Sequence, residues 1–403
     1  MSAPARWLEK HERALLRCLA IASSLSLVFF VFAAPIVGFG DPHYLWLADS
    51  FLRGRLDLSA EFVAVIGPMD TVLRDGRFYW PLGPLPALLF APAVAAFGPD
   101  MMIESYAHAF LAAAAFGTAF ALARRKGFGR TDSVWLALAF GLGSVLIGLL
   151  FMNGPWYFEN LLACVLLLAA LVEKEGKCRP ALIGALIGLA GAARLPALLV
   201  GGFFFLRELS GARSAAGKAR RIAVMAAPVL LVLLALGAYN AARFGDPFHT
   251  GQSDHYKSAS EDRARFGAFN VVNAPRNAYT YFLKLPNLAG VLPVIDPGGV
   301  SVLLLSPIFL WLLAAKPRDP DVRAAAVCAV LLLALLLSYF TDGSYQFGPR
   351  YLADALPLAF LVLLGVFKER GFGARHKAVI AASATANLAL FWVFTLHHLY
   401  GVG

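Results

Sequence analysis

Ionisable residues at the ends of apolar stretches are the first candidates for chemistry in this 403-residue sequence. Asp41 follows a long apolar run, in the stretch FGDPHY, and Pro42 favours an extended conformation that ends a helix there. A carboxylate at this position, beside His43 and Tyr44, could act as a general base or bind a cation. The alternative is that Asp41 only caps or solvates the end of a helix.

A second candidate is the stretch GSYQFGPRYLADALP, residues 343–357, at the predicted mouth of a helix. Arg350 and Asp354 are one helical turn apart, and placing either in hydrocarbon costs about 2.5–3.5 kcal/mol, so both should face a polar cavity. Arg350 is suited to bind a phosphate in a bidentate manner. Alternatively, Arg350 and Asp354 form an ion pair that only joins helices. Gln346 and Tyr351 belong to the same predicted cavity.

Two further charged residues stand at the ends of apolar segments. Arg194 lies in LAGAARLPALL, where a proline interrupts a helical hairpin. A cation held there could bind a phosphate head group, or it could extend to the membrane interface. Glu159 opens an apolar run beside Trp156 and Tyr157. The two aromatic residues are typical of an interfacial belt, whereas a glutamate at the start of a span is harder to explain in that way.

The polar region 240–297 also carries side chains suited to contacts with a sugar or a lipid head group. We expect this region to be solvated, so any one of these residues is more simply explained as part of the surface. They are Asn240, Arg243, His249, Asp254, His255, Tyr256 and Lys257.

The composition indicates what must position these residues. Hydrophobic residues make up 59% and charged residues 15% of the sequence, whereas a soluble chain has about 25% charged residues, so a cytosolic enzyme is excluded. Several apolar runs approach or exceed ~18 residues, the length of a membrane-spanning helix. The net charge of +10 does not indicate nucleic-acid binding, because Lys and Arg lie in short clusters between the apolar runs. Four cysteines are too few for a disulfide framework, and we expect no disulfides.

The basic clusters also predict the topology, with the N-terminus in the cytoplasm and the C-terminus outside. The first apolar run is too long for the core of a signal peptide. The segment 84–97 is short and contains three prolines, so we interpret it as a re-entrant or interfacial helix. The sequence therefore predicts an all-α polytopic membrane protein of about eleven transmembrane helices. The predicted spans are 14–37, 103–122, 134–151, 161–172, a hairpin of two short helices over 181–206, 222–239, 299–315, 324–340, 351–367 and 378–399.

Two predicted external loops, 38–82 and 240–297, are too long and polar to be simple connectors. We expect residues 1–403 to form one transmembrane domain with no separate soluble domain. Within the first loop, His43 to Leu56 has apolar residues at helical spacing, which predicts an amphipathic helix in the external interface. The sequence contains no glycine-rich phosphate loop, dinucleotide fingerprint or metal-binding Cys/His pair.

Taken together, these features resemble the GT-C superfamily of integral membrane glycosyltransferases, which use polyprenyl-phosphate-linked sugars. The resemblance covers most of the chain. It rests on Asp41 after the first helix, on the long first external loop, and on a Tyr-x-Pro-Leu-x-Pro-Leu stretch that leads from Tyr79 into a short helix ending at Gly98. The stretches YNAARFGDPF and YQFGPRYL add to it. The resemblance implies a GT-C-like fold.

The resemblance also implies roles for residues. Asp41 would be the catalytic base, or would help to hold a divalent cation, and Arg194 and Arg350 would bind the phosphate of the donor. The chain departs from the pattern at Pro42, since many relatives have two adjacent acidic residues there, and at Trp80, where some carry a lysine. The single carboxylate favours catalysis without a metal, and we expect no cofactor. The predicted residues of the substrate cavity are His43, Tyr44, Tyr79, Glu159, Tyr256, Gln346, Tyr351 and Asp354.

The implied reaction is the inverting transfer of a sugar from a polyprenyl-phosphate donor to an envelope lipid, glycan or protein acceptor on the external face of a bacterial inner membrane. The expected partners are this donor, the acceptor and the lipid bilayer. Two other functions stay open. A transporter or lipid flippase would use the same charged cavity for passage, and a non-catalytic subunit would only bind lipid-linked sugars or hold an assembly together.

Overall fold

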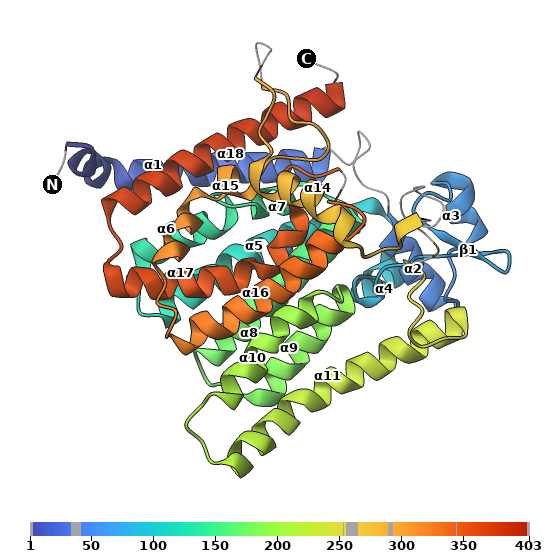
Figure 1. The fold of residues 1–403 in the computed structure, drawn as a ribbon. Helices are drawn as coiled ribbons and strands as arrows, with labels where there is room; N and C mark the ends of the chain where they lie inside the picture. The colour runs from blue at the N-terminus through green and yellow to red at the C-terminus, as the bar shows by residue number, and fades with distance from the viewer. Residues whose placement is uncertain are drawn as a thin grey trace.

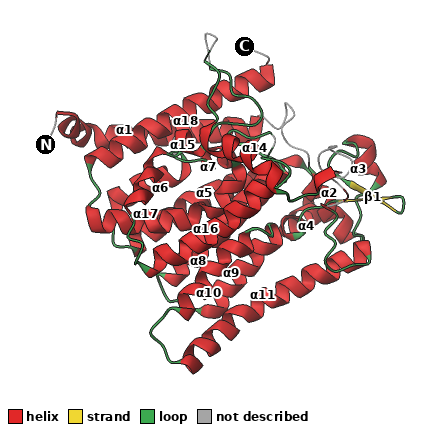
Figure 2. Ribbon diagram, viewed as in Figure 1, coloured by secondary structure: helices red, strands yellow, loops and turns green. Residues whose placement is uncertain are grey.

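The computed structural model describes residues 3–33, 42–252, 254, 265–288, 293–343 and 345–400. The described chain is a bundle of helices with almost no sheet (Figures 1 and 2). One end, at the right of Figure 1, carries α2 (His43–Leu52) and α3 (Ala60–Val65), and we call it the loop end. The opposite end, which carries Lys126 and Lys174, is called the basic end. Asp41 and Tyr256 lie outside the described residues.

Seven helices in the described part of the chain are long and apolar enough to cross a membrane, so the protein is an all-α polytopic membrane protein, as predicted. The predicted count of eleven spans is not confirmed, because the other predicted spans are shorter or broken helices. The seven are α1 (Ala3–Val28, continued by the π-helix Phe29–Ala33), α5 (Met101–Arg125), α8 (Pro155–Lys174), α11 (Ala215–Phe244), α16 (Pro320–Ser338), α17 (Leu356–Arg370, preceded by the 3-10 helix η6, Arg350–Ala355) and α18 (Ala374–Tyr400).

Local sequence explains where these helices begin and end. Asp100 accepts a hydrogen bond from the backbone N–H of Met102, and in the same way Ser214 and Asp319 cap α11 and α16. Helix α11 ends at Gly245, whose φ of +76° is the left-handed conformation that glycine adopts readily. Basic side chains in the last turn of α5, α8, α10 (Ala197–Leu209) and α17 complement the helix dipole.

The predicted hairpin is present as α9 (Pro180–Ala193) and α10, and it is broken at Arg194–Pro196 as the sequence indicated. Helix α9 packs closely against α11 because glycines line the contact. A Cβ atom on Gly184 would lie 1.9 Å from the Met225 carbonyl oxygen, and one on Gly188 would lie 3.1 Å from Val232 Cγ2. Small residues at such contacts let helix backbones approach in a membrane protein.

Two predicted continuous spans are wrong. The segment 134–151 forms α6 (Arg130–Gly141) and α7 (Leu146–Phe151), separated by a turn. The segment 299–315 forms α15 (Val302–Leu305) followed by the 3-10 helix η5 (Pro307–Ala314). Broken helices are tolerated in a membrane only where other groups satisfy the freed backbone atoms.

Polar side chains supply those partners at the two breaks. Asn387 on α18 donates from Nδ2 to the carbonyl oxygens of Leu142 and Leu305, at 2.8 Å each. Ser306 Oγ accepts a hydrogen bond of 2.9 Å from the backbone N–H of Val145. The breaks therefore lie against each other and share buried hydrogen bonds.

The first long loop differs from the prediction of a helix lying in the membrane interface. Helix α2 forms where a helix was expected, but it ends at Leu52, and residues on all its sides are buried. It packs against the short apolar helix α4 (Leu85–Phe97), so its contacts are with protein. A small hairpin of β1 (Val72–Arg74) and β2 (Arg77–Tyr79) follows, with positive φ at both turn residues, Asp75 and Gly76.

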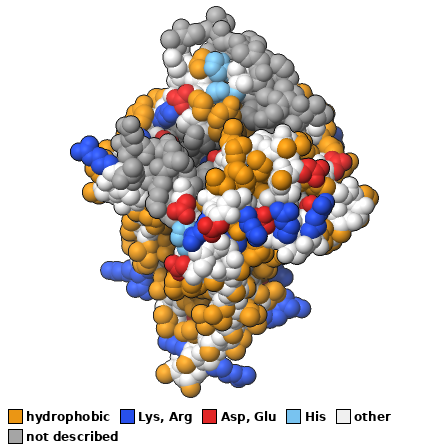
Figure 3. Space-filling view, turned by 90° about the vertical axis from the view of Figure 1, so that its right-hand side faces the viewer, with side chains coloured by type: hydrophobic (Ala, Val, Ile, Leu, Met, Phe, Trp, Pro, Cys, Tyr) orange, Lys and Arg blue, Asp and Glu red, His pale blue; other side chains and the backbone are white. Residues whose placement is uncertain are grey.

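The second loop is shorter and more structured than predicted. Helix α11 continues to Phe244, so Asn240 and Arg243 are helical, and short helices follow over 271–283: η3 (Val271–Asn273), α14 (Ala274–Ala278) and η4 (Tyr279–Leu283). In Figure 3, which views the loop end, a band of Lys, Arg, Asp and Glu side chains crosses this face. The surface below that band is largely hydrophobic, and Leu231 and Leu234 of α11 are exposed. Such a surface suits contact with lipid.

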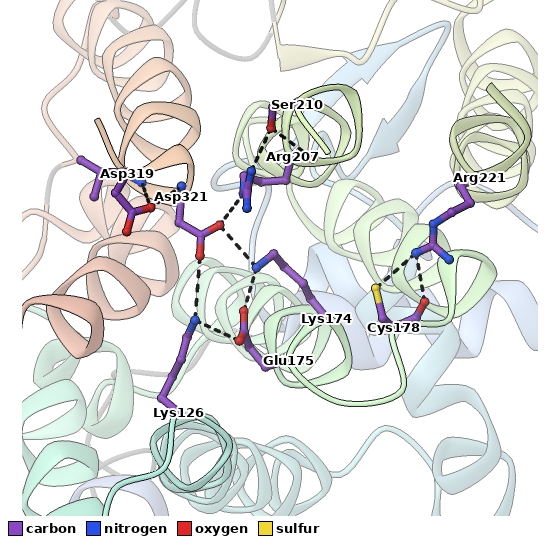
Figure 4. A network of polar contacts seen from close by, with 10 residues as sticks. Lys126, Lys174, Glu175, Cys178, Arg207, Ser210, Arg221, Asp319 and Asp321 are labelled. Atoms are coloured by element: carbon purple, nitrogen blue, oxygen red, sulfur yellow. Dashed lines mark hydrogen bonds and ion pairs between the residues drawn. The ribbon is translucent and has the colours of Figure 1, made fainter. Parts of the chain in front are cut away.

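At the basic end, an ion-pair cluster joins the ends of four helices (Figure 4). Lys126 follows α5, Lys174 and Glu175 end α8, Arg207 ends α10, and Asp321 begins α16. Lys126 and Lys174 lie 2.9 and 2.7 Å from the Glu175 carboxylate, and both reach Asp321, which also accepts a hydrogen bond from Arg207. The cluster holds together segments that are far apart in the sequence.

Candidate functional site

A cavity of about 740 Å³ lies between the start of α8, the ends of α9, α11 and α16, and the segments 81–84, 194–196, 246–252 and 350–351. Its wall includes Glu159, Arg194, Arg350 and Tyr351, four of the residues predicted from the sequence. The rest of the lining mixes apolar and polar side chains, as in sites that bind amphipathic ligands.

Arg194 lies between two carboxylates at the break between α9 and α10. Its Nε donates to Asp354 Oδ2 at 2.7 Å, and its Nη1 donates to Glu159 Oε1 at 3.3 Å. The Asp354 side chain is fully buried. The alternative pairing of Arg350 with Asp354 is therefore not observed, because Asp354 pairs with Arg194 instead. An arginine already paired in this way has less capacity to bind a phosphate than one without a carboxylate partner.

Tyr44 supports the carboxylate of Glu159 from behind the cavity wall. Its hydroxyl donates to Glu159 Oε2 at 3.1 Å, and the ring is fully buried on α2. Burial raises the pKa of Tyr44 well above its usual value, and the nearby Glu159 raises it further. Tyr44 therefore stays neutral and acts as a hydrogen-bond donor that orients Glu159.

Arg350 is the first residue of η6, and its guanidinium contacts aromatic rings rather than carboxylates. Its Cζ lies 5.4 Å from the ring centre of Tyr157 and 5.3 Å from that of Tyr351. Its buried Nε has no hydrogen-bond partner among the described residues, and none of their carboxylates forms an ion pair with it. Tyr351 also lies under Arg194, at 4.7 Å. A buried cation without a counter-charge is costly unless a ligand supplies one.

Gln346 fixes the backbone just before Arg350. Its Oε1 accepts from the Arg350 N–H at 2.9 Å, and its Nε2 donates to the carbonyl oxygens of Asp342 and Gly298 at 2.9 and 3.3 Å. A Cβ atom on Gly299 would lie 2.6 Å from the Gln346 carbonyl oxygen, and the φ of Gly299 is +75°. Gln346 is thus a positioning residue outside the lining of the cavity.

The remaining predicted residues lie elsewhere. His43 is buried and stacks on Trp80 at 4.2 Å, and Trp80 in turn contacts Trp156, which lines the cavity. Trp156 therefore belongs to the cavity wall. Tyr79 packs against Phe244 at 5.4 Å and does not line the cavity.

Sequence reasoning underestimated Asn240 and Arg243, which it placed in a solvated loop. Both line the cavity and are buried in the last turn of α11. Their spacing of three residues, directly after a long apolar run, could have indicated one buried helix face. Arg243 donates to the Trp80 carbonyl oxygen at 2.7 Å and to Asn240 Oδ1 at 2.8 Å.

The described residues contain no group of three or more His, Cys, Asp or Glu side chains arranged to hold a metal ion. The described cavity could bind an anion at Arg350 and Arg243, whereas Arg194 is already paired with Glu159 and Asp354. Apolar lining residues such as Leu199, Leu335 and Leu336 could accommodate a lipid chain.

No protein-family model and no curated protein sequence matches the chain. Solved structures resemble it in fold. ArnT from Cupriavidus metallidurans bound to undecaprenyl phosphate has a TM-score of 0.55 and 12% identity, covering 94% of this chain and 77% of that chain. The apo state of ArnT has a TM-score of 0.54 and 13% identity, covering 94% of this chain and 78% of that chain. An Archaeoglobus fulgidus oligosaccharyltransferase in the apo form has a TM-score of 0.48 and 16% identity, covering 98% of this chain and 56% of that chain. The similarity to ArnT confirms the prediction from the sequence resemblance: the chain has the GT-C fold.

Proposed function

We propose that this protein is an inverting glycosyltransferase that transfers a sugar from a polyprenyl-phosphate donor to an acceptor of the cell envelope. The reaction would take place on the external face of a bacterial inner membrane. One observation carries the proposal: Arg350 is half-buried in the wall of a partly apolar cavity, its Nε is buried, and it has no carboxylate partner among the described residues. A phosphate group attached to a lipid chain would satisfy both features of this cavity.

Two further observations support the proposal. The fold resembles that of ArnT, whose structure contains undecaprenyl phosphate. The cavity lies at the loop end, opposite the ion-pair cluster of the basic end, which the positive-inside rule assigns to the cytoplasm. This arrangement would give the sugar phosphate access to the external surface while the polyprenyl chain stays in contact with lipid.

The proposed reaction is a displacement at the anomeric carbon. A base takes the proton from an acceptor hydroxyl, the oxygen attacks the anomeric carbon, and the bond from that carbon to the phosphate oxygen breaks with its electron pair. Polyprenyl phosphate leaves with one more negative charge, which Arg350 stabilises. The anomeric configuration inverts. Because phosphate is a good leaving group, the reaction needs no second carboxylic acid of the kind that glycosidases use.

Asp41 is the proposed base, on the strength of its position after the first predicted span. We propose no cofactor, and no step passes through a metal. Arg194 is proposed to hold Glu159 and Asp354 in place rather than to bind the donor phosphate directly, because both carboxylates already contact it.

The test is transfer of radiolabelled sugar from a panel of polyprenyl-phosphate sugars to an envelope extract, using protein in proteoliposomes. We expect Arg350→Gln to lower transfer by about 100-fold, because it removes the stabilisation of the leaving group. Arg350→Lys should retain more activity, since it keeps the charge but loses the bidentate geometry. Arg220→Gln, at an exposed position of the basic end, is the matched control and should transfer normally.

Asp41→Asn should abolish transfer without loss of folded protein, and a chelator should leave wild-type transfer unchanged. Full activity of Asp41→Asn would rule out this base, and loss of activity with chelator would rule out a metal-free site. If no donor supports transfer by the wild type, the enzyme proposal fails. Scrambling of a labelled lipid by the same proteoliposomes would then favour the flippase alternative.

A further inference from the structure

A second arginine of the cavity, Arg243, also has no carboxylate partner among the described residues, and its surroundings differ from those of Arg350. It is 6% exposed and lies in the last turn of α11. Its Nη1 and Nη2 are held by the Trp80 carbonyl oxygen and by Asn240 Oδ1, at 2.7 and 2.8 Å. The guanidinium stacks on the ring of Tyr239 at 3.8 Å, so its plane is fixed.

Arg243 retains capacity to bind a ligand. In the part of the chain that the structure describes, its buried Nε has no hydrogen-bond partner and no carboxylate forms an ion pair with it. Neutral oxygens do not balance a buried positive charge, which remains costly until an anion approaches. The nearest carboxylate along the chain, Asp246, is exposed and accepts a hydrogen bond from the Phe248 N–H instead.

The contacts of Arg243 and Arg350 come from different elements. Arg243 is held by α11 and by the segment between β2 and α4, whereas Arg350 contacts Tyr157 on α8 and Tyr351 in η6. Both arginines line the same cavity. A lipid monophosphate presents one anionic group, which one of the two arginines can bind. The other arginine then requires a second anion.

We propose that Arg243, oriented by Asn240, forms a second anion-binding site that takes a phosphate or carboxylate group, separate from the lipid phosphate bound at Arg350. The assignment of Arg350 rests on the proposed function, whereas binding of an anion at Arg243 does not. In an inverting displacement the acceptor approaches from the face opposite the leaving phosphate, so an anionic group on the acceptor fits a site apart from Arg350. The other group that could supply the anion at Arg243 is the second phosphate of a diphosphate-linked donor.

Binding measurements on the purified protein in nanodiscs test this site without requiring transfer. Wild type is first saturated with undecaprenyl phosphate and then titrated with inorganic phosphate, using thermal stabilisation as the readout. We expect a saturable effect of phosphate in the wild type and in Arg220→Gln. Arg243→Gln should bind phosphate about 30-fold or more weakly while its affinity for undecaprenyl phosphate changes little. Arg243→Lys should bind phosphate with an affinity between those of wild type and Arg243→Gln. It also tests the site if Arg243→Gln does not fold.

The source of the anion is decided with undecaprenyl diphosphate. If Arg243→Gln weakens binding of the diphosphate but not of the monophosphate, the second anion belongs to the donor. If it weakens neither lipid but abolishes the phosphate effect, the anion belongs to the acceptor. Both results support a second site.

Two results would overturn the proposal. One is that lipid-saturated wild type shows no effect of phosphate. The other is that Arg243→Gln weakens undecaprenyl phosphate as strongly as Arg350→Gln does, which would make both arginines ligands of one phosphate. Failure of the wild type to bind either lipid would instead count against the proposed function. Titration of the lipid-free protein with phosphate then still tests Arg243.

Discussion

Arg194 and Arg350 line the same cavity, but only Arg194 has carboxylate partners among the described residues. Paired and unpaired buried charges have different consequences. Removing one partner of a buried ion pair destabilises the fold, because the other charge is left without compensation. A buried charge that is unpaired in the native protein carries its cost already, so its removal affects ligand binding more than folding. Breaking the ion pairs of Arg194 should therefore lower stability, whereas replacing Arg350 should lower activity with little effect on stability.

Asp354→Asn tests this distinction. The substitution leaves Arg194 with Glu159 as its remaining carboxylate, and we expect it to lower the free energy of unfolding by about 3 kcal/mol. Replacing both partners, Arg194→Met with Asp354→Leu, should recover part of the loss. Thermal unfolding in detergent measures both. Arg350→Gln is the comparison variant and should unfold close to wild type. An Asp354→Asn variant as stable as wild type would show that this pair does not hold the end of α9 and η6 together.

At the scale of elements, the two helix breaks depend on one side chain. Asn387 donates to a carbonyl oxygen from each break, Leu142 and Leu305. Asn387→Leu would leave both buried oxygens without these hydrogen bonds, and we expect a loss of about 2–4 kcal/mol in unfolding free energy. Thr395→Val on the same helix is the control, because among the described residues the Thr395 hydroxyl bonds to a carbonyl of its own helix, and its loss should cost little. Equal stability of the two variants would contradict the role given to Asn387.

The contact of α9 with α11 makes a second prediction at this scale. A Cβ atom on Gly184 would lie 1.9 Å from the Met225 carbonyl oxygen, so Gly184→Ala must push the helices apart. We expect a destabilisation of about 1–3 kcal/mol, the usual cost of overpacking. Gly365→Ala in α17 has open space around the added methyl group and should be neutral or stabilising. Thermal unfolding of both variants gives the comparison, and a stable Gly184→Ala would mean that the helices adjust freely.

Whether an element could be predicted depends on how far apart in the sequence its interacting residues lie. Helices such as α5 and α16 were predictable because their length, apolar composition and caps are local properties of the sequence. The breaks at 142–145 and at Ser306 were not, because the side chain that satisfies them, Asn387, is 245 residues from Leu142. The β1–β2 hairpin could have been predicted from Asp75-Gly76, a strong signal for a tight turn.

The same reasoning applies to the site. Charged residues beside apolar runs were recognisable individually, and three of them, Glu159, Arg194 and Arg350, line the cavity. Their pairing was not, because Arg194 and Asp354 are 160 residues apart and meet only in the folded bundle. The order of helices around the cavity decides which carboxylate reaches which arginine.

At the scale of the whole molecule, the ion-pair cluster at the basic end joins α5, α8, α10 and α16 (Figure 4). Burial raises the pKa of Glu175, but its ion pairs with Lys174 and Lys126 lower it by more, so the carboxyl titrates below its usual range. A carboxyl whose pKa is lowered by folding stabilises the protein fully when the pH is above its pKa in the unfolded chain, about 4.3. This contribution is lost as the pH falls through its pKa in the folded protein.

Glu175→Gln should therefore lower the unfolding free energy at pH 7 by about 1 kcal/mol, and the difference from wild type should shrink once the pH falls below about 4. Unfolding in detergent between neutral and acid pH measures this. Glu369→Gln is the control, since Glu369 pairs with Lys316 at an exposed position and should have almost no effect. A difference between wild type and Glu175→Gln that is constant with pH would contradict the electrostatic origin.

The orientation of the bundle links this cluster to the proposed function. The basic end and the cavity lie at opposite ends of the spans, so one must face the cytoplasm if the other faces outward. The lysines and arginines at the basic end favour the cytoplasm for that end. Single cysteines in a variant without Cys18, Cys164, Cys178 and Cys328 test this directly. Lys177→Cys marks the basic end, and Phe248→Cys marks the exposed rim of the cavity.

We expect a membrane-impermeant maleimide to label Phe248→Cys in right-side-out vesicles, and to label Lys177→Cys only after the vesicles are permeabilised. The reverse pattern would place the cavity in the cytoplasm. Arg350 and Arg243 would then still form an anion-binding cavity, but the donor would have to be presented on the inner leaflet. Transfer on the external face would be excluded even if Arg350→Gln abolished activity. Orientation and chemistry therefore need separate measurements, and the labelling pattern decides which face of the membrane supplies both substrates.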